Sequence, residues 1–487
     1  MLKVFNLPVS KWKLLLLAGD LVIFWVSALL GLLFNPMLNE APWSFLLEHR
    51  IPLLGICLTY LTVLYIGNLY DHCQDFRLWS NITGIMVWSL IGTVLVIILF
   101  YFPFSPFIGR HWMVRQAVFF ALLLVLWRYA FSAVALPQRL QQKVLIVGAG
   151  KAGSQILEAL RRRHNSGLAV IGYVDDDPQK QGTKHQGLPV LGNSSQLSEI
   201  VGQYKVNLVV LAITHGKSRA LTNALTRLCL NGAQLIDMPS LYEFLTGKVP
   251  IDHISDLWLL SKAMHNHKFY YRQAKRLLDL GMALLGLALT WPLFGIIALA
   301  IRLESAGTVF YRQERLGQDS RPFEIIKFRT MVQNAEKYGP QWASSADPRI
   351  TRVGRILRKL RLDELPQLIN ILKGEMSLIG PRPEREVFVR QFQQPLMKGR
   401  NEGPSAAPGS CTNRYEYTEQ IPFYNYRLMV KPGITGWAQV MYPYSSSLEQ
   451  TREKLQYDLY YIKNMGFSLD LAILLKTVRI VLCGRGM

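Results

Sequence analysis

The chain has 487 residues, which at roughly 150 residues per domain corresponds to about three structural units. Half of the residues are hydrophobic and 18% are charged, which excludes an intrinsically disordered protein and favours a membrane protein. The formal net charge of +21 favours an anionic partner such as lipid headgroups or a phosphorylated substrate, whereas the hydrophobic content argues against nucleic acid. The 5 scattered cysteines include no Cys-x-x-Cys pair, so they predict neither a zinc site nor a disulfide framework.

Four apolar stretches precede residue 140. They cover residues 14–34, 51–70, 82–108 and 116–137. Each is long enough to cross a hydrocarbon core of roughly 30 Å. Lysines precede the first stretch, and Arg139 and Lys143 follow the last, so the positive-inside rule predicts that both ends of a four-helix bundle are cytoplasmic. A cleaved signal peptide is the alternative for the first stretch, although its length is more typical of an anchor.

Two charged residues interrupt these stretches, Asp20 in the first and Arg128 in the fourth. Each lies about eight residues from the cytoplasmic end of its predicted helix, so both should lie at a similar depth. Isolated charges inside a membrane cost a few kcal/mol each and usually pair. We therefore predict an ion pair between Asp20 and Arg128, with separate snorkelling of each side chain to the interface as the alternative.

After Lys143 the pattern changes to short β-rich runs that alternate with helical patterns. The runs cover residues 144–147, 170–174, 208–213 and 234–237. Strands that alternate with helices predict a doubly wound parallel sheet, here a Rossmann-like domain over residues 143–264.

A glycine-rich turn follows the first of these runs, with Gly148, Gly150 and Gly153 in the G-x-G-x-x-G spacing. Between a strand and a helix, such a turn presents backbone N–H groups to a phosphate, and Asp175 at the end of the next run could accept from a ribose hydroxyl. The motif predicts a regulatory nucleotide in this domain. The alternative is a tight turn in a sheet that serves only dimerisation or regulation.

A further hydrophobic segment covers residues 277–301 and contains Thr290, Trp291 and Pro292. Proline removes a helical hydrogen bond and biases the preceding residue away from the helical region. The part before the proline would span only about 22 Å, which is short for a crossing. We therefore predict a re-entrant helix over about 275–303 that bends at Trp291-Pro292, with the Thr290 hydroxyl satisfying the backbone there. A plain fifth transmembrane helix is the alternative.

A basic, amphipathic segment follows this helix. Six cations lie within residues 349–361, interleaved with aliphatic residues: Arg349, Arg352, Arg355, Arg358, Lys359 and Arg361. On a helix this pattern is typical of a surface that lies against anionic headgroups or holds phosphates.

Two adjacent carboxylates, Asp363 and Glu364, come directly after the basic segment and just before Pro366. Such a pair is often a helix-capping feature. Beside a phosphate-binding surface, however, carboxylates can hold Mg²⁺, which favours one or two carboxylates together with substrate phosphates. One of them can also attack phosphorus and form an acyl phosphate, which divides one displacement into two.

The stretch from Lys275 to the C-terminus resembles the catalytic domain of bacterial polyprenyl-phosphate hexose-1-phosphate transferases. The motifs that carry the resemblance occur in order: Lys275-Arg276 with Asp279, Lys327-Phe-Arg-Thr-Met331, Asp347-Pro-Arg349, Leu362-Asp-Glu-Leu-Pro-Gln367, Gly380-Pro-Arg-Pro-Glu384 and Lys431-Pro-Gly-Ile-Thr-Gly-Trp-Ala-Gln439. With the preceding helices and glycine-rich domain, the chain is similar to the large form of this family.

The resemblance implies transfer of a hexose-1-phosphate from a UDP-sugar, with UDP-glucose favoured and UDP-galactose next, to undecaprenyl phosphate, which releases UMP and initiates exopolysaccharide or O-antigen synthesis. It implies that Asp363 is the nucleophile and that Glu364 holds Mg²⁺. Further residues are implied to bind substrate or phosphate: Lys327, Arg329, Arg358, Arg382, Arg427 and Lys431. The motif that ends at Gln439 is implied to contribute to the nucleotide side.

The resemblance also completes the predicted fold, a membrane α plus α/β architecture. We expect a four-helix transmembrane bundle over 1–142, the Rossmann-like domain over 143–264, and a mostly helical, monotopic catalytic domain over 265–487. The expected location is the bacterial inner membrane, with the soluble domains on its cytoplasmic face and with homodimerisation through the bundle or the middle domain. A polar segment over about 395–421 departs from the family pattern and predicts an insertion loop.

Two other functions stay open on the sequence. One is a membrane-bound, NAD-dependent nucleotide-sugar dehydratase or epimerase, which needs a Tyr-x-x-x-Lys proton relay. Tyr271 and Lys275 have that spacing, but they lie beyond the predicted sheet, so we interpret the match as chance. The other is a non-catalytic scaffold that senses a nucleotide.

Overall fold

The computed structural model describes residues 2–4, 7–9, 11–34, 42–67, 69–70, 76, 79–101, 110–135, 142–162, 168–213, 219–230, 234–254, 269–333, 335, 347–393, 395–397, 417–419, 421–442 and 448–482. The chain divides into two compact units, Met1–Thr246 and Gly247–Met487. The predicted domain boundary near residue 264 lies outside the described residues, and the second unit already begins at Gly247.

The first unit begins with a short antiparallel pair, β1 (Leu2–Val4) and β2 (Leu7–Val9), followed by the predicted apolar helices. The helices are α1 (Lys11–Leu33), α2 (Pro42–Glu48), α3 (Arg50–Ile66), α4 (Trp79–Val96) with its π-helical extension η1 (Ile97–Tyr101), and α6 (Arg110–Ala135). Of these, α1, α4 with η1, and α6 contain stretches long and apolar enough to cross a membrane. The helix α3 has 17 residues, fewer than the apolar stretch predicted at 51–70.

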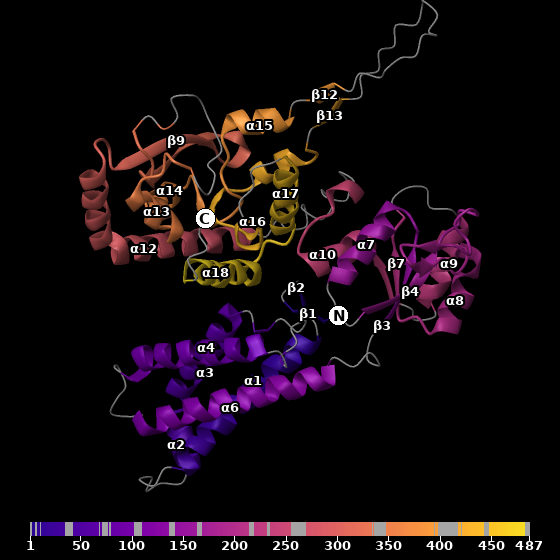
Figure 1. The fold of residues 1–487 in the computed structure, drawn as a ribbon, viewed down its shortest axis with the longest axis horizontal. Helices are drawn as coiled ribbons and strands as arrows, with labels where there is room; N and C mark the ends of the chain where they lie inside the picture. The colour runs from indigo at the N-terminus through magenta and orange to yellow at the C-terminus, as the bar shows by residue number, and fades with distance from the viewer. Residues whose placement is uncertain are drawn as a thin grey trace, which may run out of the picture. The chain divides into compact units, whose positions relative to one another are not determined.

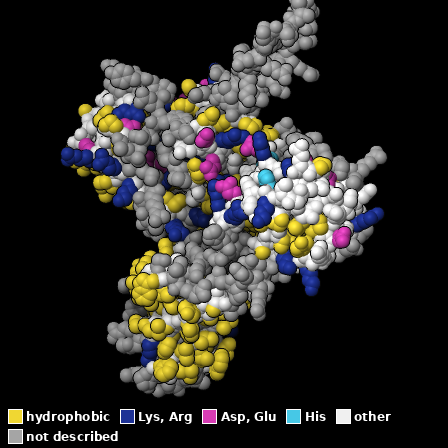
Figure 2. All heavy atoms as spheres, turned by 45° about the vertical axis from the view of Figure 1, so that its right-hand side comes forward, with side chains coloured by type: hydrophobic (Ala, Val, Ile, Leu, Met, Phe, Trp, Pro, Cys, Tyr) yellow, Lys and Arg dark blue, Asp and Glu magenta, His cyan; other side chains and the backbone are white. Residues whose placement is uncertain are grey.

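Large apolar side chains cover the outside of these helices. Leu54, Leu90 and Leu122 are 58%, 66% and 59% exposed. Figure 2 shows hydrophobic side chains over most of the described surface of this part of the molecule. Since a soluble protein rarely exposes so large a contiguous apolar surface, the arrangement identifies the helices as membrane-embedded.

The predicted intramembrane ion pair is confirmed. Arg128 in α6 donates from Nη2 to Oδ2 of Asp20 in α1 over 2.7 Å, and both side chains are fully buried. The guanidinium also lies over the rings of Tyr70 and Phe76, whose centroids are 5.1 and 5.2 Å away. A charge inside a bilayer needs such compensation, so the pair joins the first and last helices of the bundle.

A four-stranded parallel sheet forms the second half of the first unit (Figure 1). Its strands are β3 (Gln142–Val147), β4 (Leu168–Val174), β7 (Leu208–Leu211) and β8 (Gln234–Asp237), in the order β4-β3-β7-β8. Smaller elements are β5 (Lys184–His185), β6 (Leu188–Pro189) and η3 (Ser194–Gln196). The four predicted runs are therefore strands, and the third ends at Leu211 rather than at residue 213.

Helices cover both faces of this sheet, as predicted for a doubly wound domain. The helices α7 (Lys151–Arg162) and α10 (Met238–Thr246) lie on one face, and α8 (Leu197–Tyr204) and α9 (Arg219–Leu230) on the other (Figure 1). Side chains alternate accordingly along β3: Val144 and Ile146 pack with α7 and α10, whereas Leu145 and Val147 pack with α8 and α9.

The second unit contains α12 (Phe269–Glu304), an apolar helix of 36 residues with Pro292 inside it. Figure 1 shows its ribbon in two limbs that meet at a corner. Each limb packs against the rest of this unit. Before the proline, Ala283 of α12 lies in one hydrophobic cluster with Phe323 and Leu368. After it, Ile301 lies in another cluster with Phe328 and Leu357.

The Thr290 hydroxyl binds the backbone near this bend, as predicted, although not at the carbonyl that the proline leaves without its helical donor. Because Pro292 has no N–H, the carbonyl of Ala288 loses its helical donor. The hydroxyl of Thr290 donates to the carbonyl of Gly286 over 2.7 Å instead. The exposed side chains of α12 include large apolar ones on either side of Pro292, with Trp291 at 75% and Ile296 at 66% exposure. The helix therefore presents an unburied apolar surface on both sides of its proline.

The rest of the second unit is a mostly helical layer with short strand pairs. It comprises η4 (Ile251–His253), β9 (Phe310–Leu316), η5 (Gln318–Ser320), β10 (Pro322–Phe328), α13 (Arg352–Lys359), η6 (Leu362–Glu364), α14 (Gln367–Lys373), β11 (Ser377–Ile379), α15 (Glu386–Gln393), β12 (Pro395–Met397), β13 (Tyr417–Glu419), η7 (Tyr424–Met429), β14 (Gly433–Thr435), α16 (Trp437–Met441), α17 (Leu448–Lys463) and α18 (Phe467–Leu482). The strands pair as β9 with β10 and β12 with β13, both antiparallel, and β11 with β14 in parallel. The predicted insertion over about 395–421 includes the antiparallel pair β12 and β13, and residues 398–416 between these strands are outside the described residues.

Candidate active site

The acidic pair lies on a short 3₁₀ turn between two helices. The preceding helix α13 ends at Lys359, and Arg361 then adopts a left-handed conformation with φ 55°. This conformation costs an ordinary residue roughly 1–2 kcal/mol, so packing must hold it in place. As a result the chain turns inward, and Asp363 and Glu364 are only 9% and 6% exposed.

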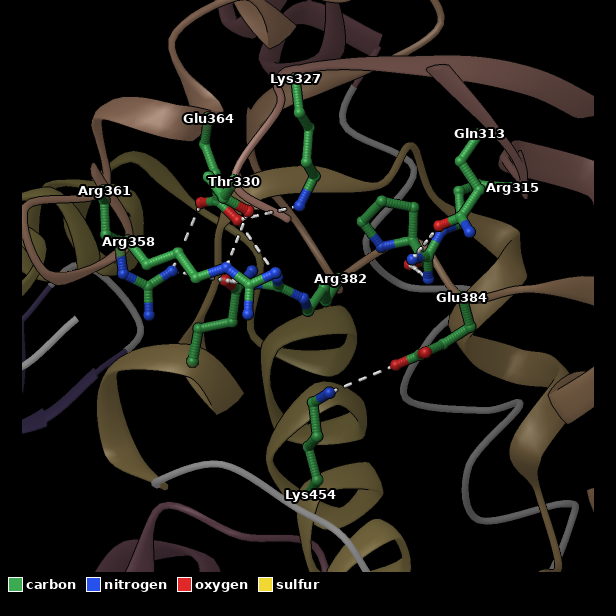
Figure 3. A network of polar contacts seen from close by, with 12 residues as sticks. Gln313, Arg315, Lys327, Thr330, Arg358, Arg361, Glu364, Arg382, Glu384 and Lys454 are labelled. Atoms are coloured by element: carbon green, nitrogen blue, oxygen red, sulfur yellow. Dashed lines mark hydrogen bonds and ion pairs between the residues drawn. The ribbon is translucent and has the colours of Figure 1, made fainter. Parts of the chain in front are cut away.

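Three cations surround the carboxylate of Glu364 (Figure 3). Its Oε1 lies 3.3 Å from Nζ of Lys327 and 3.1 Å from Nη2 of Arg382, and its Oε2 lies 3.4 Å from Nη1 of Arg361. The cations come from three separate segments, namely β10, the turn before η6 and the loop after β11. Folding therefore gathers around one carboxylate charges that are far apart in the sequence.

Burial and these cations act on the two carboxyl groups in opposite directions. Burial alone would raise the pKa of Glu364, but Arg382, Lys327 and Arg361 outweigh it and lower the pKa to about 2. For Asp363, burial and then the neighbouring charge of Glu364 raise the pKa above its ordinary value. A raised pKa makes the carboxylate of Asp363 a better nucleophile, whereas the lowered pKa of Glu364 keeps Glu364 itself ionised. The pair is thus divided into two chemically different groups.

Arg358 on α13 and Gln439 on α16 complete the side of the site that faces these carboxylates. The Nε of Arg358 donates to the hydroxyl of Thr330 over 2.9 Å. Among the described residues, no hydrogen-bond partner is found for the two terminal nitrogens of Arg358. The amide oxygen of Gln439 accepts from Nη1 of Arg382 over 3.1 Å.

A second charged network lies behind Arg382 and holds its backbone. The guanidinium of Arg427 donates to the carbonyl of Arg382 over 3.1 Å and lies 3.1 Å from the carboxylate of Asp458. Arg315 donates to the carbonyl of Pro383 over 3.2 Å. Two guanidiniums thus hold consecutive carbonyls of the Pro-Arg-Pro segment. Arg427 is 4% exposed, so its position here supports Arg382 rather than faces a ligand.

Glu384, the residue after this Pro-Arg-Pro segment, belongs to the same network. Its Oε1 lies 3.2 Å from Nζ of Lys454 and 3.5 Å from Nη1 of Arg427. Burial would raise the pKa of Glu384, but Lys454 and Arg427 outweigh it and lower the pKa to about 2. The ion pairs therefore keep a partly buried carboxylate charged directly beside the Arg382 loop (Figure 3).

Two other predicted phosphate-binding residues lie outside the Glu364 network. Arg329 donates to the carbonyls of Ser305 and Ala306 over 2.6 and 2.9 Å, so it fastens the turn that follows α12. The ammonium of Lys431 lies beside Arg276, and burial together with this neighbouring charge lowers the pKa of Lys431. Phosphate contacts by these two residues remain predictions.

Sequence reasoning did not single out three residues of the site. Arg361 appeared only as one member of the basic run, Gln439 only as the end of a motif, and Glu384 only as the end of another. The signal for each was present, but the contacts of Arg361 with Glu364, of Gln439 with Arg382 and of Glu384 with Arg427 depend on the tertiary structure.

The glycine turn of the middle domain has the expected location between β3 and α7. Gly148 has φ 110°, a conformation that favours glycine, and a side chain at Gly153 would collide with the carbonyl of Gly148. The carboxylate of Asp175 accepts from the backbone N–H of Ala149 over 2.6 Å, within the turn that Gly150 completes. Asp175 therefore contacts the loop itself, and a nucleotide there remains a prediction.

Tyr271 and Lys275 share one partner. The hydroxyl of Tyr271 and the ammonium of Lys275 lie 2.7 and 2.9 Å from Oδ2 of Asp470 in α18. Since the residues are four apart on α12, both side chains reach the same carboxylate. Their spacing is accounted for by this clamp between α12 and α18.

The donor set fits a magnesium ion that binds together with a substrate diphosphate. Within the described ranges, no three side chains of His, Cys, Asp or Glu gather closely enough to form a metal cage on their own. Mg²⁺ needs only one or two carboxylates when substrate phosphates and water complete its shell, and Asp363 and Glu364 supply that number. Lys327 and Arg361 already face the two oxygens of Glu364. Mg²⁺ would therefore have to bind together with an anionic ligand that attracts these two side chains away from the carboxylate.

The second unit thus combines a buried acidic pair among cations with an unburied apolar helix. Comparison with known proteins identifies its family. The family described as bacterial sugar transferase matches residues 270–413 and 403–484, and a CoA-binding domain family matches residues 77–239.

Several curated relatives support the same assignment. A UDP-N-acetylgalactosamine-undecaprenyl-phosphate N-acetylgalactosaminephosphotransferase of Aeromonas hydrophila is 42% identical over 54% of this chain and 55% of its own length. UDP-glucose:undecaprenyl-phosphate glucose-1-phosphate transferases of Xanthomonas campestris pv. campestris and Escherichia coli (strain K12) are each 31% identical over 69% of this chain, and over 66% and 67% of their own lengths. The chain belongs to the bacterial sugar transferase family. It spans from about half to two thirds of the length of these relatives.

Proposed function

We propose that this protein transfers a hexose-1-phosphate from a UDP-sugar to undecaprenyl phosphate and so initiates a lipid-linked glycan. The observation that carries the proposal is the pair of Asp363 and Glu364, buried among Lys327, Arg382 and Arg361. An anionic diphosphate matches this concentration of positive charge. The family relatives act on UDP-sugars and undecaprenyl phosphate according to their names.

In the proposed first step, the carboxylate of Asp363 attacks the phosphorus that carries the sugar. The bond from this phosphorus to the bridging oxygen breaks, UMP leaves with that oxygen, and an aspartyl phosphosugar forms. In the second step, a phosphate oxygen of undecaprenyl phosphate attacks the same phosphorus. The aspartyl oxygen–phosphorus bond breaks, the lipid diphosphate sugar leaves, and the carboxylate of Asp363 is regenerated. No net proton transfer is needed.

The cations have distinct tasks in this scheme. Arg382, Lys327 and Arg358 neutralise the charge that builds up on the transferring and leaving phosphoryl oxygens. The raised pKa of Asp363 favours nucleophilic attack, because a more basic carboxylate donates electrons more readily. Mg²⁺ held by Glu364 and the diphosphate would supply further charge neutralisation.

We propose that α12 is re-entrant, so that both of its ends lie on the cytoplasmic side of the inner membrane. Contacts at the two ends support this. Near its start Lys275 binds Asp470, and at its end Glu304 accepts from the backbone N–H groups of Arg352 and Val353 over 2.6 and 2.9 Å. A helix that crossed a core of roughly 30 Å would place these ends on opposite faces of the bilayer. One compact unit could not then bind both.

The sugar is the finer part of the proposal. UDP-glucose is our first expectation and UDP-galactose the next. The relatives' names include glucose, galactose and N-acetylgalactosamine, so UDP-N-acetylgalactosamine belongs in the same comparison. A regulatory nucleotide at the glycine turn is proposed on the G-x-G-x-x-G motif, and homodimerisation is proposed through the bundle or the middle domain.

The deciding experiment incubates purified full-length protein with a UDP-sugar that carries label in the sugar phosphate, without lipid acceptor. We expect label to stay covalently bound, to be lost from Asp363→Asn, and to chase into lipid when undecaprenyl phosphate is added. Glu386→Gln is the matched control, because Glu386 is an acidic residue whose partner Arg390 lies at the surface. Full turnover by Asp363→Asn would contradict the proposal, as would product formation without any labelled protein under rapid quenching.

A further inference from the structure

The two arginines that face Glu364 share one neutral acceptor. The amide oxygen of Gln439 lies 3.1 Å from Nη1 of Arg382 and 3.5 Å from Nη1 of Arg361. Two guanidiniums that approach one another repel, and an oxygen between them offsets the repulsion. The same contacts fix the orientation of the amide, because its NH₂ group in this position would face two cations. The location of Gln439 therefore influences where both arginines lie.

Gln439 lies on a helix that is too short to be stable without tertiary contacts. The helix α16 (Trp437–Met441) has five residues and no side-chain cap at Gly436. A helix this short is unstable unless tertiary contacts fix it. Ala438 is 1% exposed, Val440 packs against the core of the unit, and the Trp437 ring stacks on Tyr460 with a centroid separation of 5.8 Å.

The indole N–H of Trp437 has a specific anchor. It donates to the carbonyl of Gly247 over 2.8 Å. Gly247 has φ 67°, and a Cβ there would lie only 3.1 Å from the Trp437 ring. Both the backbone conformation and the close approach of the indole therefore require glycine at this position.

Gly247 is the residue at which the chain leaves α10 of the middle domain and enters the second unit. The segment it opens is built into the core of that unit. Val249 and Ile251 are 0% and 2% exposed and pack with Leu455 and Leu459. The backbone N–H of Val249 donates to the carbonyl of Gln456 over 3.0 Å. The exit point from the middle domain is thus held against α16 and α17.

Resting on the proposed function, we propose that Trp437 is a positioning residue for phosphosugar transfer: held by Gly247 at the exit from the middle domain, it places Gln439, which in turn places Arg361 and Arg382 over Glu364. The chain that connects the two units is then part of the support of the active site. A change in the middle domain that moves Gly247 would displace the Trp437 indole and with it the Gln439 amide. It would thereby change the positions of the two arginines.

A double-mutant cycle in the full-length protein tests this. The readout is the single-turnover rate of covalent labelling by UDP-sugar. Trp437→Phe keeps a ring that can stack on Tyr460 but removes the N–H donated to Gly247. Gln439→Ala removes the shared oxygen. We expect each single variant to label about tenfold more slowly at saturating UDP-sugar, with a smaller change in KM, because one hydrogen bond of roughly this worth is lost.

The interaction between the two changes decides the proposal. If Trp437 acts through Gln439, the double variant labels no more slowly than Gln439→Ala alone. Rate losses that multiply would overturn the proposal. Should Trp437→Phe not fold, as judged by circular dichroism, Gly247→Ala takes its place in the cycle, because a methyl group there displaces the same ring. Absence of label on the unsubstituted protein would instead contradict the proposed function, so the two failures are distinguishable.

Asp252→Asn is the matched control within the same segment. Asp252 pairs with Arg452 at the surface, where both side chains are more than two-fifths exposed. Exposed ion pairs contribute little, so we expect an unchanged labelling rate. A loss equal to that of Trp437→Phe would show that any loosening of the segment slows labelling, and it would overturn the specific role of Trp437.

Discussion

Arg382→Ala is the sharpest test of the proposed phosphoryl site. The guanidinium of Arg382 contacts both Glu364 and Gln439, each over 3.1 Å. Removing one preorganised donor from a site of developing negative charge typically lowers the rate roughly 10²- to 10³-fold. We expect a loss of this size in the single-turnover rate of covalent labelling by UDP-sugar. The fold should persist, because Lys327 and Arg361 still face Glu364.

Rapid-quench labelling at several UDP-sugar concentrations separates binding from chemistry. The loss should persist at saturation if Arg382 stabilises the transition state, and it should disappear there if Arg382 only binds substrate. Arg390→Ala is the control, because Arg390 is 74% exposed and pairs with Glu386 on the same helix. A labelling rate for Arg382→Ala within threefold of the unsubstituted protein would refute the placement of the transferring phosphate beside Glu364.

Three further outcomes follow from the same structure. Asp20→Asn and Arg128→Gln should each destabilise the bundle by about 3–5 kcal/mol, measured as unfolding in detergent. The double variant should lose less than the sum of the two single losses. Strict additivity would mean that the ion pair contributes nothing. The lowered pKa of Glu384 contributes stability that is present above its ordinary pKa near 4.5 and is lost as the pH falls toward about 2. Below pH 4.5 the thermal midpoint of the unsubstituted protein should therefore drop more steeply with pH than that of Glu384→Gln. Parallel curves for the two proteins would contradict this. Arg358→Lys should label more slowly by about tenfold while keeping its KM within threefold, because a lysine replaces the planar guanidinium by a point charge; an unchanged rate would exclude a directed contact.

The bent helix α12 carries a large apolar surface and is also bound to the elements around the charged site. Its apolar outer surface, with Leu277 at 71% and Leu303 at 79% exposure, has no protein partner among the described residues of its own unit. Its polar ends are bound by the elements that carry the site, through Asp470 at one end and Arg352 at the other. If α12 is re-entrant as proposed, a site supported in this way would lie close to the bilayer surface, where a lipid phosphate would be presented.

The sequence alone determined much of this architecture. Apolar stretches and their flanking charges predicted the helices of the bundle, and the requirement that a charge inside a membrane be compensated predicted the Asp20–Arg128 pair. Short β-rich runs that alternate with helical patterns predicted all four strands of the middle sheet. This was possible because a buried parallel strand is encoded locally, as a short run of apolar residues. The motifs around Asp363 and Glu364 identified the family, since their order and spacing are specific.

Tertiary structure decided the assignment of tasks among the basic residues. In the sequence, Arg329, Arg382 and Arg427 were equivalent candidates for phosphate contacts. Folding directs Arg329 to the turn after α12, buries Arg427 behind the Arg382 loop, and leaves Arg382 facing Glu364. A cation's role depends on which carboxylates and carbonyls lie within a few ångströms, and that is set by long-range packing rather than by spacing along the chain.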